Sequence, residues 1–270
     1  MGRAHGAPQA TIYVKGFLFG GERPEAFDPW LESHRRLAPH GWDGAAAGWI
    51  WQSGGLTSLP VPVAAATRLV WDVYRSVRLA RSVAILPHVG FALAEVAGRF
   101  LAQYAYAARV AAETAEGLAN AIRELRRTGT DVRLVAHSLG CWPAIHAAHL
   151  LDPDERPREI HLLAPACVED ELGDRLDRLA RQRTYVFFSP NDPVLALGFR
   201  AVALRSALGL VGPRRSYNGL VAVDASTQLG WLRSHGDYKH RLWELVAALE
   251  SSRADEREAA PLGLATPILA

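Results

Sequence analysis

Short runs of β-branched and aromatic residues alternate with longer stretches of helical periodicity along most of the chain. The runs are nearly all apolar, which is typical of strands buried on both faces of a parallel sheet. The predicted strands are 11–15, 48–52, 132–136, 159–163, 184–188 and 220–223. The predicted helices lie near 28–38, 103–127, 139–151, 169–182, 193–208 and 238–251. This alternation predicts an α/β fold, with a mostly parallel sheet flanked by helices.

The spacing of these elements is interrupted once, between the second and third strands. About 80 residues separate them, far more than one crossover helix requires, and 56–102 is predicted to be an inserted pair of helices. The insertion could be a fixed cap or cladding on the sheet, a lid over an apolar substrate site, or a peripheral membrane contact through 68–98, where arginines interleave with apolar residues. We therefore predict a single domain over 1–251 with this insertion, followed by a loose C-terminal tail over 252–270.

Composition excludes several classes of function. The 30 basic and 28 acidic residues nearly balance, and the arginines are spread from Arg3 to Arg257 rather than concentrated, so no nucleic-acid partner is expected. Cys141 and Cys167 are too few and too isolated for a disulfide framework or a zinc knuckle, which favours a reducing, cytoplasmic location. The N-terminus lacks an apolar region of signal-peptide length, and no run reaches about 18 apolar residues, so no membrane span is expected.

The most informative motif begins at the third predicted strand, where VRLVA runs directly into the turn HSLG and then into a helix. A nucleophile on such a sharp turn projects its hydroxyl from the sheet, and small residues two positions before and after it let neighbouring backbone approach. Ala136 and Gly140 are those small residues, with Ala136 standing where glycine is usual. The positive end of the helix dipole would lie near any developing negative charge. Ser138 is therefore the predicted nucleophile, the alternative being a serine that only caps the helix.

A serine is a poor nucleophile unless a base takes its proton and a third group orients that base. These partners are expected downstream, the acid before the histidine, each on a loop after a later strand. Asp192 lies in the loop SPNDP after the fifth predicted strand, and His235 lies in SHGDY after the sixth. We predict that Asp192 orients His235, which accepts the Ser138 proton and later gives it to the leaving group. Asp170 and Asp224 are alternative acids.

The other histidines are less well placed for this role. His137 lies inside the turn and is expected to point away from the nucleophile, and His161 lies within a strand. His146 and His149 have an i, i+3 spacing that is compatible with metal binding, but no acidic or cysteine partner accompanies them. No metal and no cofactor are therefore expected.

Acyl transfer also requires donors for the developing oxyanion. One predicted donor is the backbone N–H of Leu139, directly after the nucleophile. The other should come from the loop after an early strand, here KGFLFGG, where Gly16 allows a sharp turn and the N–H of Phe17 is the expected donor. The alternative is that KGFLFGG is only a glycine-rich turn.

Taken in this order, the G-F-L turn at Gly16, the HSLG turn, the SPNDP loop and HGDY from His235 resemble the α/β-hydrolase superfamily. The chain is more closely similar to a lipase-like family called domain of unknown function 726. The segments that carry this likeness include GWIWQSG from Gly48, LLAPAC from Leu162 and SPNDPVLALGFR from Ser189. The likeness spans roughly 11–245 and implies an α/β-hydrolase fold and a serine hydrolase, without a named reaction. Members of that family carry membrane-spanning segments, which are not expected here.

The leading prediction is a serine esterase that cleaves a carboxylic ester or thioester of an acyl or lipid-like substrate, a small molecule, through an acyl-enzyme. The apolar insertion favours an acyl substrate, whereas Trp142 near the turn could narrow the pocket and favour a small acyl group. The alternative is a noncatalytic hydrolase fold that docks a partner or anionic lipid through the arginine-bearing insertion. The intact Ser, Asp and His set argues against this alternative, because nothing structural requires all three.

Overall fold

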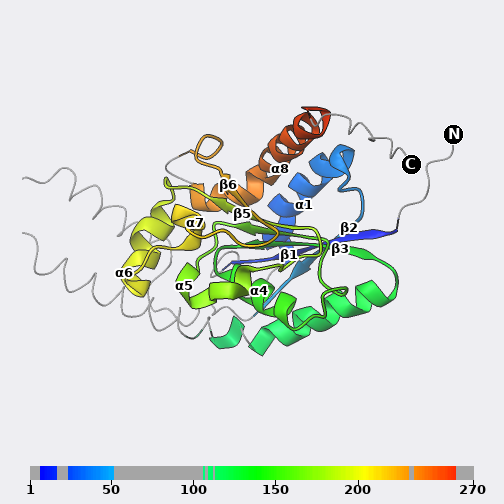
Figure 1. Cartoon of the computed structure of the whole chain (residues 1–270), viewed down its shortest axis with the longest axis horizontal. Helices are drawn as coiled ribbons and strands as arrows, with labels where there is room; N and C mark the ends of the chain where they lie inside the picture. The colour runs from blue at the N-terminus through cyan, green and yellow to red at the C-terminus, as the bar shows by residue number, and fades with distance from the viewer. Residues whose placement is uncertain are drawn as a thin grey trace, which may run out of the picture.

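The computed structural model of the protein describes residues 7–16, 24–51, 106, 109–111, 113–230 and 234–259. Its strands form one parallel sheet in the order β2-β1-β3-β4-β5-β6 (Figure 1). The strands are β1 (Gln9–Val14), β2 (Ala45–Trp49), β3 (Asp131–His137), β4 (Glu159–Leu163), β5 (Arg183–Phe188) and β6 (Leu220–Asp224). The predicted α/β fold with a parallel sheet is confirmed, and each predicted strand is present within three residues of its expected bounds.

The order of the strands reverses direction beside β1. The chain passes from β1 to β2 on one side and then crosses to β3 on the other side of β1. In open α/β sheets, ligands bind at the carboxyl ends of the strands at such a switch point. The last residue of β1, Val14, pairs in register with Ala136 of β3, two residues before Ser138. The topology thus brings the loop after β1 to the turn that carries Ser138.

Helices cover both faces of the sheet (Figure 1). On one face, α1 (Asp28–Leu37) packs against α8 (Ser234–Ala259), and Ser33 Oγ donates a hydrogen bond to the backbone oxygen of Lys239 at 3.0 Å. On the other face lie α4 (Cys141–His149) and a helix over 113–127. Because both faces are covered, the central strands β3 and β4 are buried almost throughout, as their apolar sequences predict.

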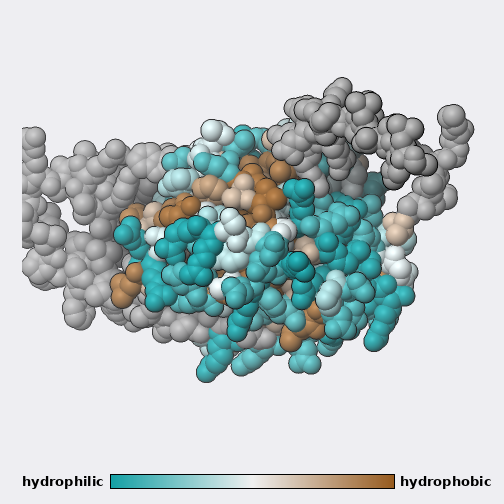
Figure 2. All heavy atoms as spheres, viewed as in Figure 1, coloured by the Kyte–Doolittle hydropathy of each residue, from teal (hydrophilic) through white to brown (hydrophobic). Residues whose placement is uncertain are grey.

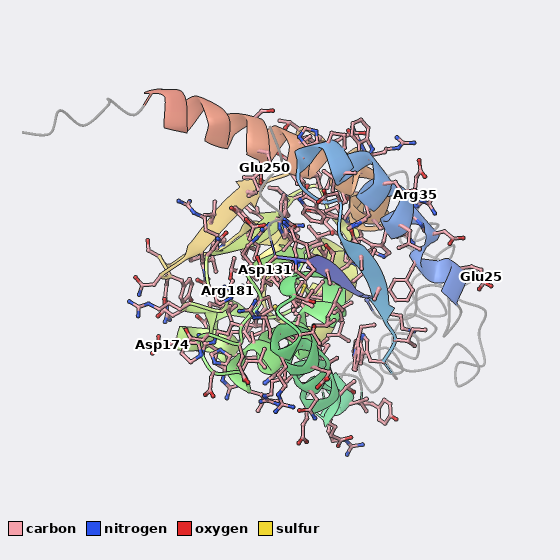
Figure 3. The ribbon with its side chains drawn as sticks, turned by 90° about the vertical axis from the view of Figure 1, so that its right-hand side faces the viewer. Glu25, Arg35, Asp131, Asp174, Arg181 and Glu250 are labelled. Carbon is pink, nitrogen blue, oxygen red and sulfur yellow. The ribbon has the colours of Figure 1, made fainter. Side chains whose placement is uncertain are left out.

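Ion pairs occupy the amino edge of the sheet, opposite to Ser138. Figure 3 looks onto this edge, where Arg181 donates to Asp131 at the start of β3, and Arg158 Nη1 lies 3.5 Å from the same carboxylate. Two residues further along β3, the buried Arg133 Nε donates to Glu159 Oε2 at 3.2 Å. The charged groups of the sheet are therefore concentrated at the end away from the predicted nucleophile.

The helix predicted over 169–182 is wrong in extent. The chain forms only α5 (Glu169–Leu172) and a 3₁₀ turn, η5 (Gly173–Leu176). Gly173 adopts a φ of 51°, which a right-handed helix does not allow and which glycine reaches without steric cost. A single glycine therefore ends a helix that the apolar periodicity alone would continue.

The helix predicted over 193–208 is divided into three short elements. A π-helical turn, η6 (Val194–Phe199), leads into α6 (Arg200–Ala203), and α7 (Leu208–Val211) follows after a break. The break occurs at Leu204, whose φ of 53° ends α6. Nothing in the sequence marks this residue as a helix terminator, because leucine rarely adopts a positive φ.

The last helix is longer than predicted. The tail expected from Ser252 begins inside α8, which continues to Ala259, and 260–270 lie outside the described residues. The predicted insertion 56–102, including the segment 68–98, also lies outside them. Among the helices that the structure describes, none is both long and apolar enough to cross a membrane.

Candidate active site

Ser138 occupies a strained turn between a strand and a helix. It follows the last residue of β3 and begins a 3₁₀ turn, η4 (Ser138–Gly140), that continues into α4. Its φ of 55° lies in the left-handed region, which costs a residue with a side chain about 1–3 kcal/mol. The Ala166 N–H, from the loop after β4, donates to the backbone oxygen of Ser138 at 3.2 Å and helps to hold the turn. The strand-turn-helix geometry predicted for this motif is present.

Two glycines allow the loop after β1 to lie directly against this turn. A Cβ atom on Gly140 would clash with the backbone oxygen of Lys15, and one on Gly16 would lie 2.9 Å from Ser138 Cβ. The Lys15 oxygen also accepts a hydrogen bond from Trp51 Nε1 at 2.8 Å, which fixes the end of β1. Small residues are thus required on both sides of the contact, as the sequence pattern predicts for Gly140.

Of the two predicted oxyanion donors, the structure describes Leu139 and does not describe Phe17. Leu139 is buried, and its amide is the first one after Ser138 at the start of η4. Phe17 lies outside the described residues, although Gly16, which precedes it, lies beside Ser138. One predicted donor and the start of the loop that carries the other are therefore adjacent to the Ser138 side chain.

The structure brings the three predicted residues of the site together. His235 Nε2 lies 2.9 Å from Ser138 Oγ, and His235 Nδ1 lies 2.6 Å from Asp192 Oδ2. Ser138 comes from the end of β3, Asp192 from the loop after β5, and His235 from the first turn of α8. All three side chains are buried, with exposed fractions of 6%, 0% and 3%. This is a continuous hydrogen-bonded chain from hydroxyl to carboxylate.

Backbone groups hold the Asp192 carboxylate in place. Its Oδ1 atom accepts the N–H groups of Val194 and Leu195, each at 3.0 Å, which leaves Oδ2 for His235. The neighbouring loops are joined as well, since Ser234 Oγ donates to the backbone oxygen of Asn191 at 3.0 Å. The carboxylate therefore cannot rotate without losing bonds to the start of η6.

His137 is part of the site, which sequence reasoning missed. Its ring points into the layer between the sheet and α8, and its Nε2 lies 2.7 Å from the backbone oxygen of His235. The two rings are close, with centroids 4.8 Å apart. Burial, and then the nearby His235, lower the pKa of His137 well below its ordinary value. The only signal in the sequence is its position at the end of the strand, where alternation turns its side chain to the face that α8 covers.

The alternative acids and the histidine pair have other partners. Asp170 is exposed, and both its carboxylate oxygens lie 3.1 Å from Arg214 Nη2. Asp224 Oδ1 accepts the N–H of Ser226 at 2.8 Å. His146 stacks on Trp142, and His149 Nε2 lies 2.6 Å from the backbone oxygen of Arg175. Among the described residues there is no group of three or more side chains that could hold a metal ion.

Two buried thiols flank the turn. Cys141 is the first residue of α4, and Cys167 follows β4. Burial raises the pKa of both thiols, that of Cys141 well above its ordinary value. Because the thiolate is the reactive form of cysteine, neither sulfur is suited to act as the nucleophile. Ser138 is the only hydroxyl or thiol of the described residues for which the structure gives a hydrogen bond to the His235 ring.

A family model described as "Alpha/beta hydrolase of unknown function (DUF900)" matches residues 91–227, just over half of the chain. The chain belongs to this family. Membership in DUF900 confirms the predicted α/β-hydrolase superfamily and supports a hydrolase, while the likeness to domain of unknown function 726 is not confirmed by it. No curated protein matches the chain. The DUF900 match includes Ser138 and Asp192 and ends before His235.

Proposed function

We propose that this DUF900 hydrolase cleaves carboxylic esters or thioesters, with Ser138 as nucleophile, His235 as general base and Asp192 as the group that orients the base. The observation that carries the proposal is the chain of short distances from Ser138 Oγ through the His235 ring to Asp192 Oδ2, 2.9 and 2.6 Å. These distances permit proton transfer without rearrangement. The strained φ of Ser138 adds support, since strain of this kind is found where a side chain must be presented to a substrate.

In the first half of the proposed reaction, Ser138 Oγ attacks the carbonyl carbon while its proton passes to His235 Nε2. The carbonyl oxygen becomes an oxyanion that accepts the Leu139 N–H, and we infer that the Phe17 N–H is the second donor. When the tetrahedral intermediate collapses, the carbon–oxygen or carbon–sulfur bond breaks. The proton on His235 Nε2 moves to the departing alcohol or thiol, leaving an ester between the acyl group and Ser138.

In the second half, a water molecule takes the place of the leaving group. His235 Nε2 accepts a proton from this water as its oxygen attacks the acyl carbon, and the proton then returns to Ser138 Oγ as the carboxylic acid leaves. Asp192 Oδ2 accepts the Nδ1–H of His235 throughout, which keeps Nε2 free to accept a proton and stabilises the imidazolium in both halves. The reaction requires no cofactor and no redox change.

An acyl or lipid-like substrate is supported by the apolar surface that follows Asp192. Val194, Leu197 and Leu204 are exposed, with fractions of 42%, 44% and 86%, and Figure 2 shows apolar side chains over α6 and α7. The stretch 193–213 contains no acidic residue. Apolar surface beside polar reacting groups is typical of sites that bind apolar ligands. A series of 4-nitrophenyl esters of increasing chain length would test this: activity confined to acetate would instead favour the small acyl group inferred from Trp142.

A fluorophosphonate probe tests the proposed nucleophile most directly. We expect one covalent adduct, which mass spectrometry maps to Ser138, and no labelling of Ser138→Ala. Labelling should also be lost or strongly slowed in Asp192→Asn and His235→Ala, and remain unchanged in the matched control Ser251→Ala, an exposed serine of α8. Undiminished labelling of Ser138→Ala would refute the assignment.

The location of the protein and the roles of the segment 56–102 are further parts of the proposal. We infer a reducing, cytoplasmic location, in keeping with two buried, unpaired cysteines. A membrane contact through 68–98, and the alternative of a noncatalytic docking module, both depend on a segment outside the described residues. Flotation of the full chain with anionic vesicles would test the membrane contact, and turnover of any ester that requires Ser138 would exclude a purely noncatalytic role.

A further inference from the structure

His137 is enclosed by the elements that build the site. It is the last residue of β3, only 3% exposed, and its ring lies among the rings of Trp30 from α1 and of His235 and Tyr238 from α8. The centroid distances are 6.1, 4.8 and 6.2 Å respectively. The shortest of them is to His235. The ring is therefore packed between the two helices at the start of α8, where His235 reaches Ser138.

The chemistry of its hydrogen bond assigns the proton on the His137 ring. Its Nε2 atom lies 2.7 Å from the backbone oxygen of His235, and a carbonyl oxygen can only accept. Nε2 must therefore carry a proton. Because burial keeps the pKa of His137 low, the ring is neutral and Nδ1 carries no proton. A Cβ atom on Gly16 would lie 3.1 Å from this Nδ1, so the glycine also keeps room for the ring.

We propose that His137 is a positioning residue, which holds the main chain of His235 so that the imidazole of His235 stays in register with Ser138. This inference rests on the proposed function, since it concerns the general base of that reaction. Two consecutive residues of one turn contact His235 at two points: Ser138 Oγ meets the ring, and His137 Nε2 meets the backbone oxygen. The ends of β3 and α8 are thereby fixed relative to each other at the reacting atoms.

The position of His235 at the start of α8 explains why a hydrogen bond to its backbone oxygen matters. His235 is the second residue of α8, and helix ends are where backbone structure frays most easily. A displacement of about 1 Å between reacting groups can cost about 10² in rate. A neutral ring is also required at this position, because a second positive charge beside His235 would oppose formation of the imidazolium. A buried histidine with its proton on Nε2 meets both needs, whereas lysine or arginine would not.

The rate of fluorophosphonate labelling measures the effect on the nucleophile. We expect His137→Phe, which keeps a ring but removes the donor, to lower the labelling rate and kcat about 10- to 100-fold with little change in KM. His137→Gln, whose amide nitrogen can reach the position of Nε2, should recover most of the loss. The matched control is His149→Phe, which removes the same kind of bond, from Nε2 to a backbone oxygen, on α4. Its labelling rate should equal that of the unmodified protein.

A spectroscopic readout separates this inference from the proposed function. The Nδ1–H proton of His235, bonded to Asp192, should give a far-downfield proton resonance whether or not the protein turns over an ester. We expect His137→Phe to shift or broaden this resonance, and His149→Phe to leave it unchanged. If the unmodified protein is not labelled but the resonance still responds to His137→Phe, the hydrolase proposal fails and the positioning role stands. A folded His137→Phe protein with unchanged resonance and unchanged labelling rate would overturn the positioning role.

Folding of the variants does not limit the test. Should His137→Phe fail to fold, His137→Leu removes the donor with a smaller apolar side chain and is compared with His137→Gln under the same conditions. The proposal requires the leucine variant to be slower than the glutamine variant in labelling. Equal rates for the two would contradict it.

Discussion

Asp192 and Glu169 are two buried carboxylates that the fold holds in the same manner and uses differently. Asp192 Oδ1 accepts two consecutive amides at the start of η6, each at 3.0 Å. Glu169 Oε1 accepts the amides of Arg214 and Arg215, also at 3.0 Å each. In both places a carboxylate satisfies backbone donors that would otherwise be costly to bury. The local backbone chemistry therefore does not distinguish a candidate reacting group from a structural one.

The two carboxylates differ in the side chain that faces their second oxygen. Asp192 Oδ2 faces the imidazole ring of His235, whose Nδ1 lies 2.6 Å away. Glu169 Oε2 faces Arg214 Nε at 3.1 Å, and an arginine keeps its charge under all ordinary conditions. Burial alone would raise the pKa of Glu169, but the hydrogen bonds from the amides of Arg214 and Arg215 and from the side chains of Arg214 and Tyr217 outweigh it and lower that pKa. A carboxylate with arginine is a fixed clamp between α5 and the loop before β6, whereas one with histidine can orient an imidazole that acts as a base.

The largest expected effect comes from removing the charge of Asp192 alone. In Asp192→Asn the amide oxygen can still accept the η6 amides, but the amide nitrogen would face His235 Nδ1 and force the proton of the ring onto Nε2. Since a protonated Nε2 cannot accept the Ser138 proton, kcat/KM should fall about 10⁴-fold. Ester hydrolysis measured together with urea unfolding separates this loss from misfolding. A fall of less than about tenfold would show that Asp192, like Glu169, has only a structural role.

The contrast also shows what the sequence could predict. The strands could be predicted because apolar runs define buried strands, and the contact between Asp192 and His235 could be predicted because both residues follow such strands. The Glu169 clamp was not, since its arginine partners are about 45 residues away and come close only through the fold. The contact of His137 cannot be predicted from residue types, because its partner is the backbone oxygen of His235. The ends of helices could not be predicted where a residue other than glycine adopts a positive φ, as Leu204 does.

Glu169→Gln should give the complementary result, with stability lost and chemistry kept. An amide nitrogen in place of one carboxylate oxygen would face donors of Arg214 or Tyr217, so a buried pairing is broken at a cost of about 1–3 kcal/mol in the free energy of unfolding. Activity per folded molecule should remain that of the unmodified protein. Urea unfolding and active-site titration measure the two quantities. Loss of activity in the fully folded variant would show that the clamp also shapes the site.

The buried histidines and the Glu169 carboxylate should affect the free energy of unfolding in different pH ranges. Burial lowers the pKa of His137 and of His161, so both stay neutral in the folded protein while the unfolded chain binds protons below about pH 6.5. The free energy of unfolding should therefore be fully present above that pH and fall by roughly 1–2 kcal/mol between pH 7.5 and 5.5. The pKa of the Glu169 carboxyl is lowered in the folded protein, so its contribution to the free energy of unfolding should be lost only below about pH 4.5. Urea midpoints across this range test the order.

A variant without one of these histidines identifies the source of the upper window. His161→Phe keeps a ring among the aromatic neighbours Tyr185 and Phe187 and removes one titrating group. Its urea midpoint should change less between pH 7.5 and 5.5 than that of the unmodified protein. A pH profile that stays flat from 7.5 to 5.5 in the unmodified protein would contradict the assignment of neutral buried histidines.

The smallest effect should come from Asp170, the neighbour of Glu169 and an alternative acid in the sequence. Its pair with Arg214 Nη2 is largely exposed, with 45% and 61% of the two side chains accessible, so solvent screens the charges. Asp170→Asn should leave both the urea midpoint and kcat/KM unchanged, at low salt as well as at high salt. Glu169→Gln and Asp192→Asn, assayed beside it, supply the positive results for stability and for activity. If Asp170→Asn instead lost activity to the same extent as Asp192→Asn, the acid of the site would have been assigned to the wrong strand end.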